Sequence, residues 1–282
     1  MEGLNMKRWG MAVAVAAAAL CALLAMAGCT AGEKYTPQSK DAVVSTPVIG
    51  QEGVLRVGVN TGNPPLAGQT SEIVGIDVDV ASALADEMGL KVEIVDVGTE
   101  AVDSLEKGTV DVVLGVASST SDKKMWKSST YLPTAVALFA TSADAGMPTK
   151  GDGKKIASQA SSMSAYASTE AFGKAAVRSS ADLQSAFNEL SAGSVDYVAA
   201  DAVIGHYAAN TSGLDVTVVG LVDKAAGYSA GVLATNKDLC SQVKSNLKAL
   251  NDGGVIAAIE KKWLGSALDL SQLQVASADK AK

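Results

Sequence analysis

One nine-residue pattern occurs twice in this chain of 282 residues, and it constrains the fold more strongly than any other feature. Residues 105–113 read Leu-Glu-Lys-Gly-Thr-Val-Asp-Val-Val, and residues 190–198 read Leu-Ser-Ala-Gly-Ser-Val-Asp-Tyr-Val. In both copies an apolar run of strand length follows a leucine and a glycine that end a helix. The copies are too few and too far apart for a solenoid. Two lobes of similar construction explain them, although coincidence would also do so, because this helix–turn–strand chemistry is common.

Short apolar runs alternate with amphipathic segments on both sides of the repeat. We expect strands at residues 55–59, 91–97, 110–116, 155–158, 195–200, 215–219 and 231–234. We expect helices at residues 76–88, 101–106, 165–172, 183–190, 239–250 and 256–263. Ser179 is the predicted N-cap of the helix that begins near Leu183. This alternation is typical of an α/β fold whose open sheets have parallel strands.

Residues 1–28 have the composition of a secretory signal peptide, with a basic start and an uncharged run at residues 9–28. Small residues precede Cys29, and this end resembles a bacterial lipobox. We therefore predict cleavage before Cys29, acylation of its sulfur, and a tether at residues 29–50. An uncleaved membrane anchor is the alternative, because 20 uncharged residues can cross a bilayer. Translation could begin at Met6 rather than at the first residue.

Composition argues against several classes of function. The formal net charge of −7 disfavours a general nucleic-acid binder, which would show a basic stripe. A single histidine, His206, and three cysteines argue against a His-rich metal site, a four-cysteine zinc site and a Ser-His-Asp triad. We therefore predict no catalytic residue, no metal and no cofactor. If Cys29 carries lipid, Cys240 is the one cysteine left, and we expect it to be a small buried apolar side chain.

Polar residues follow several of the predicted strands. Ligands of open α/β sheets bind beyond the carboxyl ends of the strands, where helix N-termini favour anions. Lys123 would add a positive charge there and Asp201 a negative charge, so the pair suits a small zwitterion. The candidate ligand-binding residues are Asn60, Asn63, Ser118, Lys123, Gln159, Ser162, Met163 and Asp201. Roles as helix caps, turn residues or surface charges are the structural alternatives, so the hypothesis depends on joint placement.

Six segments of the chain carry a family resemblance. They are residues 55–65, 75–84, 110–123, 130–134, 195–201 and 259–265. The most specific is Gly75-Ile-Asp-Val-Asp-Val-Ala-Ser-Ala-Leu84. In this order they resemble the bacterial extracellular solute-binding proteins of family 3, which are polar amino-acid receptors of ABC importers. The resemblance covers about residues 51–265.

The resemblance implies a two-lobed periplasmic-binding-protein fold, in which two hinge strands join α/β lobes that close on a solute. Lobe 1 would comprise residues 51–135 and 231–267, lobe 2 residues 136–230, and residues 268–282 a tail. The expected protein is a lipid-anchored monomer on the outer side of the cell membrane. Its expected partners are a small polar solute, foremost an amino acid, an ABC permease, and membrane lipid through Cys29, with no nucleic acid.

The family pattern also implies roles for individual residues. Ser118 would meet the solute's carboxylate, Lys123 falls where arginine is usual, and Asp201 would take the α-ammonium group. The other residues on ligand positions are Gln159, Ser162, Met163, Asn60 and Asn63. Lys123 lacks the bidentate fork of arginine, and Asn63 stands where a ring is common, so the scaffold is better determined than the solute. Two alternatives remain: a dehydratase-like enzyme on the same scaffold, with Asp201 as general acid, and a signalling or adhesion lipoprotein without a ligand.

Overall fold

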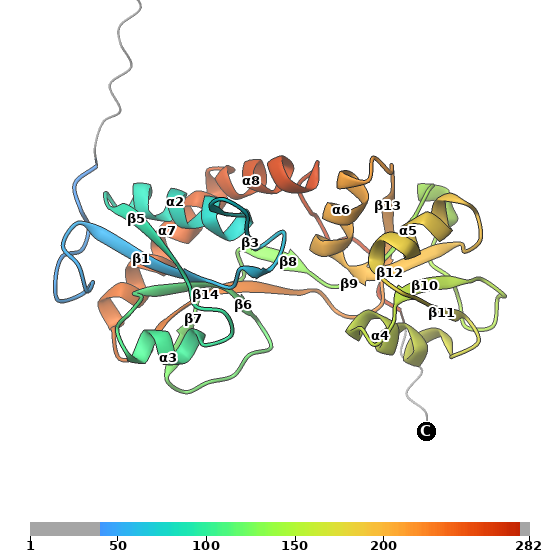
Figure 1. Ribbon diagram of the computed structural model, residues 1–282, viewed down its shortest axis with the longest axis horizontal. Helices are drawn as coiled ribbons and strands as arrows, with labels where there is room; N and C mark the ends of the chain where they lie inside the picture. Colours follow the sequence, from blue (N-terminus) through green and yellow to red (C-terminus); the bar gives the residue numbers. More distant parts are fainter. Residues whose placement is uncertain (1–39, 277–282) are drawn as a thin grey trace, which may run out of the picture. The chain divides into compact units, whose positions relative to one another are not determined.

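The computed structural model describes residues 40–276, which form two main β-sheets with helices on both faces of each (Figure 1). The predicted signal peptide, Cys29 and the start of the predicted tether lie outside the described residues. A small third sheet contains β2 (Gly62–Asn63), β3 (Ala67–Gln69) and β4 (Ile73–Val74). The predicted alternation of strands and helices is confirmed.

The first sheet has the strand order β5-β1-β6-β14-β7, and β8 also pairs with β14. Its strands are β1 (Val54–Val59), β5 (Lys91–Asp96), β6 (Val112–Ala117), β7 (Met125–Lys127), β8 (Leu132–Thr134) and β14 (Ala226–Leu233). Its helices are α2 (Ile76–Glu87), α3 (Ala101–Glu106), α7 (Lys237–Asp252) and α8 (Val255–Leu264). One apolar cluster joins the sheet to α2, α7 and α8, and a second joins it to α3, so both faces are covered. Cys240 is buried in the first cluster, as predicted.

The second sheet has the strand order β11-β10-β12-β9-β13. Its strands are β9 (Val136–Ala140), β10 (Ile156–Gln159), β11 (Val177–Ser180), β12 (Tyr197–Asp201) and β13 (Thr217–Leu221). Its helices are α4 (Met163–Phe172), α5 (Leu183–Ser191) and α6 (Ala202–Thr211), after a short 3-10 helix, η1 (Ala143–Ala145). The cluster around Phe187 includes residues of α5 and α6, and the cluster around Phe172 includes residues of α4. Each sheet with its helices is one lobe.

Two expectations about the strands were wrong. The sheets are mixed rather than parallel, because β14 runs antiparallel to β6, and β9 antiparallel to β12 and β13. Ser179 lies in β11, and Asp182 caps α5 instead, accepting a bond of 2.7 Å from the Ser185 N–H. The boundary expected at residue 231 falls inside β14, which belongs to the first sheet from Ala226 onward.

The repeated pattern performs the same structural task in both lobes. In the first, the Asp111 carboxylate accepts from the Arg56 N–H at 3.0 Å, and the Asp111 N–H donates to the Arg56 carbonyl at 2.8 Å. In the second, the Asp196 carboxylate accepts from the Lys155 N–H at 2.8 Å, and the Asp196 N–H donates to the Lys155 carbonyl at 2.9 Å. Each aspartate thus ties its glycine turn to a neighbouring parallel strand, β1 in the first lobe and the start of β10 in the second. Two lobes of similar construction are the result.

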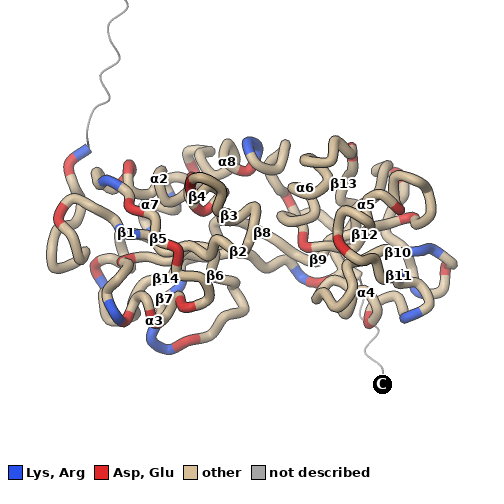
Figure 2. The backbone as a smooth tube through the Cα atoms, viewed as in Figure 1, with Lys and Arg blue, Asp and Glu red and all other residues tan. Residues whose placement is uncertain are grey.

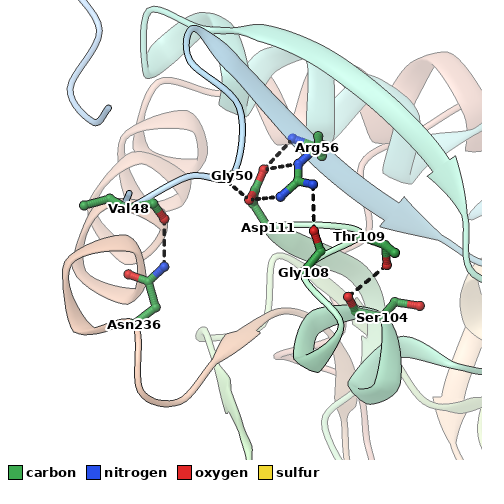
Figure 3. Close-up of polar contacts among 8 residues, drawn as sticks. All are labelled: Val48, Gly50, Arg56, Ser104, Gly108, Thr109, Asp111 and Asn236. Atoms are coloured by element: carbon green, nitrogen blue, oxygen red, sulfur yellow. Dashed lines mark hydrogen bonds and ion pairs between the residues drawn. The ribbon is translucent and has the colours of Figure 1, made fainter. Parts of the chain in front are cut away.

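The first copy of this junction is also buried under the N-terminal segment (Figure 3). The Arg56 guanidinium binds both Asp111 oxygens, at 2.7 and 3.1 Å, and the Gly108 carbonyl at 2.7 Å. The Gly50 N–H donates to Asp111 at 2.9 Å. Residues 40–50 are therefore not a free tether as predicted. Their apolar side chains pack on the first lobe, where Ile49 is almost fully buried, because burial of that surface favours docking.

Three chain segments connect the two sheets. Ala135 alone separates β8 from β9, and residues 222–225 separate β13 from β14. The third segment is the tail that follows α8: Leu270 is buried in the second lobe, and the Leu221 N–H donates to the Gln274 carbonyl at 2.8 Å. The predicted tail therefore packs on the second lobe through its apolar residues, at least as far as residue 276.

The two copies of the junction predict unequal losses of stability. Arg56→Ala should lower the free energy of unfolding by about 3 kcal/mol, because it leaves the buried Asp111 carboxylate without its countercharge. Lys154→Ala removes the exposed partner of Asp196 and should lower the free energy of unfolding much less, because solvent screens an exposed ion pair. Urea unfolding of both variants measures the difference. Equal losses would show that burial of the first junction is not what makes it important.

Candidate ligand-binding site

The first-lobe candidates lie where β1 and β6 end. Asn60 directly follows β1, Asn63 is in β2, and Ser118 directly follows β6. The Ser118 N–H donates to the Gly227 carbonyl at 2.8 Å, and the Ser118 hydroxyl accepts from the Gly227 N–H at 3.2 Å. This pair of bonds fixes Ser118 against β14. The hydroxyl can still donate one hydrogen bond to a ligand.

The loop after Ser118 places its lysines differently from the sequence expectation. The Lys127 ammonium donates to the Ser118 carbonyl at 2.6 Å and to the Thr120 carbonyl, so it holds the loop rather than a ligand. Lys123, the predicted carboxylate partner, is exposed and lines neither of the two pockets described below. The positive charge that the sequence analysis assigned to the site is thus outside both pockets.

A pocket of about 500 Å³ opens beside Asn60. Apolar walls come from Val97, Val102 and the end of β6, and Thr120 lies at another edge. The charged side chains that line it are Glu100 and Asp103, both exposed. This pocket therefore combines an apolar floor with a negative rim.

The four second-lobe candidates share a single pocket of about 200 Å³. It is lined by Gln159, Ser162, Met163 and Asp201, together with Ser164, Leu183, Ala199, Ala200 and Ile204. Gln159 ends β10, Ser162 caps α4 by accepting from the Ala165 N–H at 3.1 Å, and Asp201 ends β12. The joint placement on which the sequence hypothesis depended is present in this lobe, because parallel β10 and β12 end at the same edge of the sheet.

Asp201 is the charged residue of that pocket, and it is also part of the hinge. One carboxylate oxygen caps α6, accepting from the Val203 and Ile204 N–H groups at 3.0 and 3.1 Å. The other oxygen accepts from the Thr134 hydroxyl of β8 at 2.7 Å. Burial raises the pKa of Asp201, and the three hydrogen bonds oppose that rise. The capping alternative is correct, yet the half-buried carboxylate still faces the pocket.

Sequence reasoning missed a buried acid beneath the first-lobe half of the site. Asp77 is fully buried at the start of α2 and accepts from the Tyr131 hydroxyl at 2.5 Å, which in turn accepts from the Gly115 N–H at 2.9 Å. Burial raises the pKa of Asp77 to about 7, and the Tyr131 bond opposes the rise. Gly115 has φ +71°, and a Cβ there would lie 2.6 Å from the Asp77 carboxylate. An acidic residue in the first turn of a helix is common, because it interacts favourably with the helix dipole. The sequence therefore gives no sign that Asp77 is buried, and only the fold reveals it.

Tyr228 in β14 lies between the strands that carry two polar groups of the first lobe. Its Cα pairs with Ala117 on one side and Leu132 on the other, so it lies between β6, which leads to Ser118, and β8, which leads to Thr134. The ring is half-buried. In the sequence, Tyr228 was visible only as an aromatic residue just before a predicted strand, and such a pattern does not show which strands it will pair with.

Residues 40–276 contain neither a cluster of metal ligands nor a membrane-spanning helix. In this range no group of three or more His, Cys, Asp or Glu side chains is arranged to hold a metal ion. No helix of the same range is long and apolar enough to cross a bilayer. Lysine and arginine are interspersed with acidic residues rather than aligned as a basic stripe over the part of the chain that is drawn (Figure 2).

Two α/β lobes, joined by short segments and carrying polar groups at their strand ends, define a two-lobed binding protein of the periplasmic type. The family model of bacterial extracellular solute-binding proteins, family 3, matches residues 55–266. This chain belongs to that family. The resemblance stated from the motifs is therefore confirmed, and so is the two-lobed fold.

Solved structures agree with the assignment. An ancestral cationic amino acid solute binding protein is 26% identical, with a TM-score of 0.62 over 75% of this chain and 96% of that one. A polar amino acid ABC uptake transporter substrate binding protein from Streptococcus thermophilus is 20% identical, with a TM-score of 0.67 over 76% and 87%. The L-cystine solute receptor of Neisseria gonorrhoeae is 20% identical, with a TM-score of 0.65 over 76% and 94%. The search of curated proteins found no match.

The buried acid predicts a pH-dependent stability. Asp77 is ionised at pH 5 in the unfolded chain but protonated in the fold, so its stabilising contribution declines as the pH rises toward its folded pKa of about 7. Asp77→Asn keeps an acceptor for Tyr131 and removes this titration. Its stability relative to the unmodified protein should grow by roughly 3 kcal/mol between about pH 5 and 8. Urea unfolding across that range tests this, and a constant difference would contradict it.

Proposed function

We propose that this protein is the substrate-binding component of an ABC importer, which captures a small polar solute between its lobes and delivers it to a membrane permease. The observation that carries the proposal is the second-lobe pocket, where Gln159, Ser162, Met163 and Asp201 meet at the hinge. Hydrogen-bonding groups, one charge and an apolar wall suffice for binding a solute. The alternatives of an enzyme and of a protein without a ligand are outcomes of the tests below.

The charges of the site favour a solute with an ammonium group, foremost an amino acid. The charged side chains that line the two pockets are Glu100, Asp103 and Asp201, all of them acidic. We propose that Asp201 binds the ammonium group and that Ser118 donates to the solute's carboxylate. Lys123, which lines neither pocket, would act on that carboxylate from a distance, and salt would screen its effect. The ancestral relative is a cationic amino acid solute binding protein, and that ligand class is consistent with this choice.

The proposal extends to the location of the protein. The family consists of extracellular solute-binding proteins, and the N-terminal sequence has the features of a lipoprotein signal. We therefore propose a monomer that is anchored through Cys29 on the outer side of the membrane. Docking of residues 40–50 on the first lobe would leave residues 29–39 as the linker. The same proposal includes the lobe boundaries. Lobe 1 comprises residues 51–135 and 231–267, and lobe 2 comprises residues 136–230, except that the whole of β14 is assigned to lobe 1.

Asp201→Asn should abolish binding without disturbing the fold. Asparagine can still cap α6 and contact Thr134, but it carries no charge for an ammonium group. Isothermal calorimetry against the twenty protein amino acids should show micromolar binding by the unmodified protein and at least a roughly 100-fold loss in the variant. Asp196→Asn, at the structural aspartate of the second repeat, is the matched control and should keep its affinity.

Three results would count against the proposal. Unchanged affinity of the Asp201→Asn variant would reject the site. Formation of a product during the titration would favour an enzyme. No binding across amino acids, amines and sugars would favour a protein without a ligand.

Affinity should also fall in mild acid. Burial raises the pKa of Asp201, so its carboxylate takes up a proton at a higher pH than an exposed aspartate does. Only the ionised form attracts an ammonium group, so Kd should increase as the pH falls through that raised pKa. Calorimetry is best done in an Asp77→Asn background, because Asp77 also titrates, near pH 7. Affinity that stays constant down to about pH 4 would contradict the assigned role of Asp201.

A further inference from the structure

The strap, as we name residues 265–276 after α8, is anchored in both lobes. The Leu268 side chain packs on the first-lobe cluster, and its N–H donates to the buried Glu260 carboxylate of α8 at 2.9 Å. Leu270 belongs to a cluster of the second lobe and is only 5% exposed. The strap therefore passes from one lobe to the other within a single residue, Asp269.

Beyond Leu270 the strap pairs with the edge of the second sheet. The Leu221 N–H of β13 donates to the Gln274 carbonyl at 2.8 Å, and the Leu221 carbonyl accepts from the Ala276 N–H at 2.7 Å. Leu221 thereby forms a parallel bridge with Val275. Because these backbone bonds add to the burial of Leu270, the strap cannot slide along the second lobe without losing them.

The strap lies on the side of the hinge strands that is opposite to the pockets. The larger pocket is lined by residues of α3, which covers one face of the first sheet, whereas α8 covers the other face. The smaller pocket is lined in part by the first turn of α4, whereas the strap packs with α5 and α6. Figure 1 shows α8 and α6 above the strands that join the lobes, and α3 and α4 below them. A rotation that brings the pockets together therefore separates the lobes where the strap crosses.

The crossing is too short to follow such a rotation. Each pocket is lined by residues of one lobe, so binding between the lobes requires that they close. Two residues of extended chain span at most about 7 Å, so the path from Leu268 to Leu270 has almost no slack. Closure would have to pull Leu270 from its cluster or break the bond between Leu268 and Glu260. Either loss raises the free energy of the closed form relative to the open form.

We propose that the strap opposes closure of the lobes and thereby keeps the protein open when no solute is bound. This inference rests on the proposed function, because it concerns how tightly the same site holds its solute. A protein that delivers a solute to a permease also has to release it, and a restraint that destabilises the closed form favours release. The strap acts on affinity without touching the solute.

Lengthening the crossing tests the restraint while both anchors stay in place. Insertion of Gly-Ser-Gly-Ser between Leu268 and Asp269 keeps Glu260 bonded and Leu270 buried, and a short flexible insertion costs little stability. The variant should bind roughly 5-fold or more tightly, because the closed form no longer strains the strap. The probe is whichever of the twenty protein amino acids binds the unmodified protein most tightly by calorimetry. The same insertion after Gly151, in an exposed turn of the second lobe, is the matched control and should leave Kd unchanged.

A second variant covers the case in which the insertion variant fails to fold. Leu268→Gly removes the half-buried side chain that holds the strap on the first lobe, and it should also tighten binding. Small-angle X-ray scattering without solute gives a further readout. Either variant should have a smaller radius of gyration than the unmodified protein, because fewer molecules stay open.

Three results would overturn the inference. They are unchanged or weaker affinity of the variants, an equal gain in the Gly151 control, and variants that without solute are at least as extended as the unmodified protein. Failure of the proposed function gives a different result, in which the unmodified protein binds no amino acid. The scattering comparison needs no solute, so it still decides whether the strap opposes closure.

Discussion

The hydrogen bonds of the Asp201 carboxylate are the interaction on which the proposed binding site depends. They connect the last strand residue of one lobe with the Thr134 hydroxyl of the other lobe and with the first turn of α6. All of these donors are neutral, so they orient the carboxylate without cancelling its charge. A bound ammonium group would supply the missing countercharge at a group that is already positioned, and little ordering would be needed on binding.

The contrast with the repeated aspartates shows which acids serve the fold and which remain available to a solute. Asp111 binds a guanidinium and Asp196 binds an ammonium group, and both tie a glycine turn to a strand. Asp201 forms no ion pair with any residue in the range 40–276. A half-buried acid without a countercharge costs folding free energy, and such a cost is typical of positions that bind ligands.

The sequence could predict features that depend on nearby residues, and it could not predict features that depend on contacts between distant parts of the chain. Strand ends are local features that can be read from the sequence. Because ligands bind beyond the carboxyl ends of strands, the sequence could predict that Gln159, Ser162 and Asp201 would share one pocket. In the loop after β6, the side chain that donates to two backbone carbonyls is that of Lys127, and periodicity cannot reveal such a contact. The pairing of β14 with β6 and β8 joins residues about a hundred positions apart in the chain, and the short β7 and β8 likewise have no local pattern.

The position of Lys123 also changes the expected selectivity. A zwitterion held at both ends needs a positive and a negative group in the site, and arginine at position 123 would have provided a bidentate partner for the carboxylate. Lys123 is exposed and lines neither pocket, so the charged side chains that line the two pockets are the carboxylates of Glu100, Asp103 and Asp201. Discrimination would then depend on the cationic end of a solute, and the carboxylate end would contribute mainly through neutral donors such as Ser118. Solutes of equal size should therefore rank by positive charge.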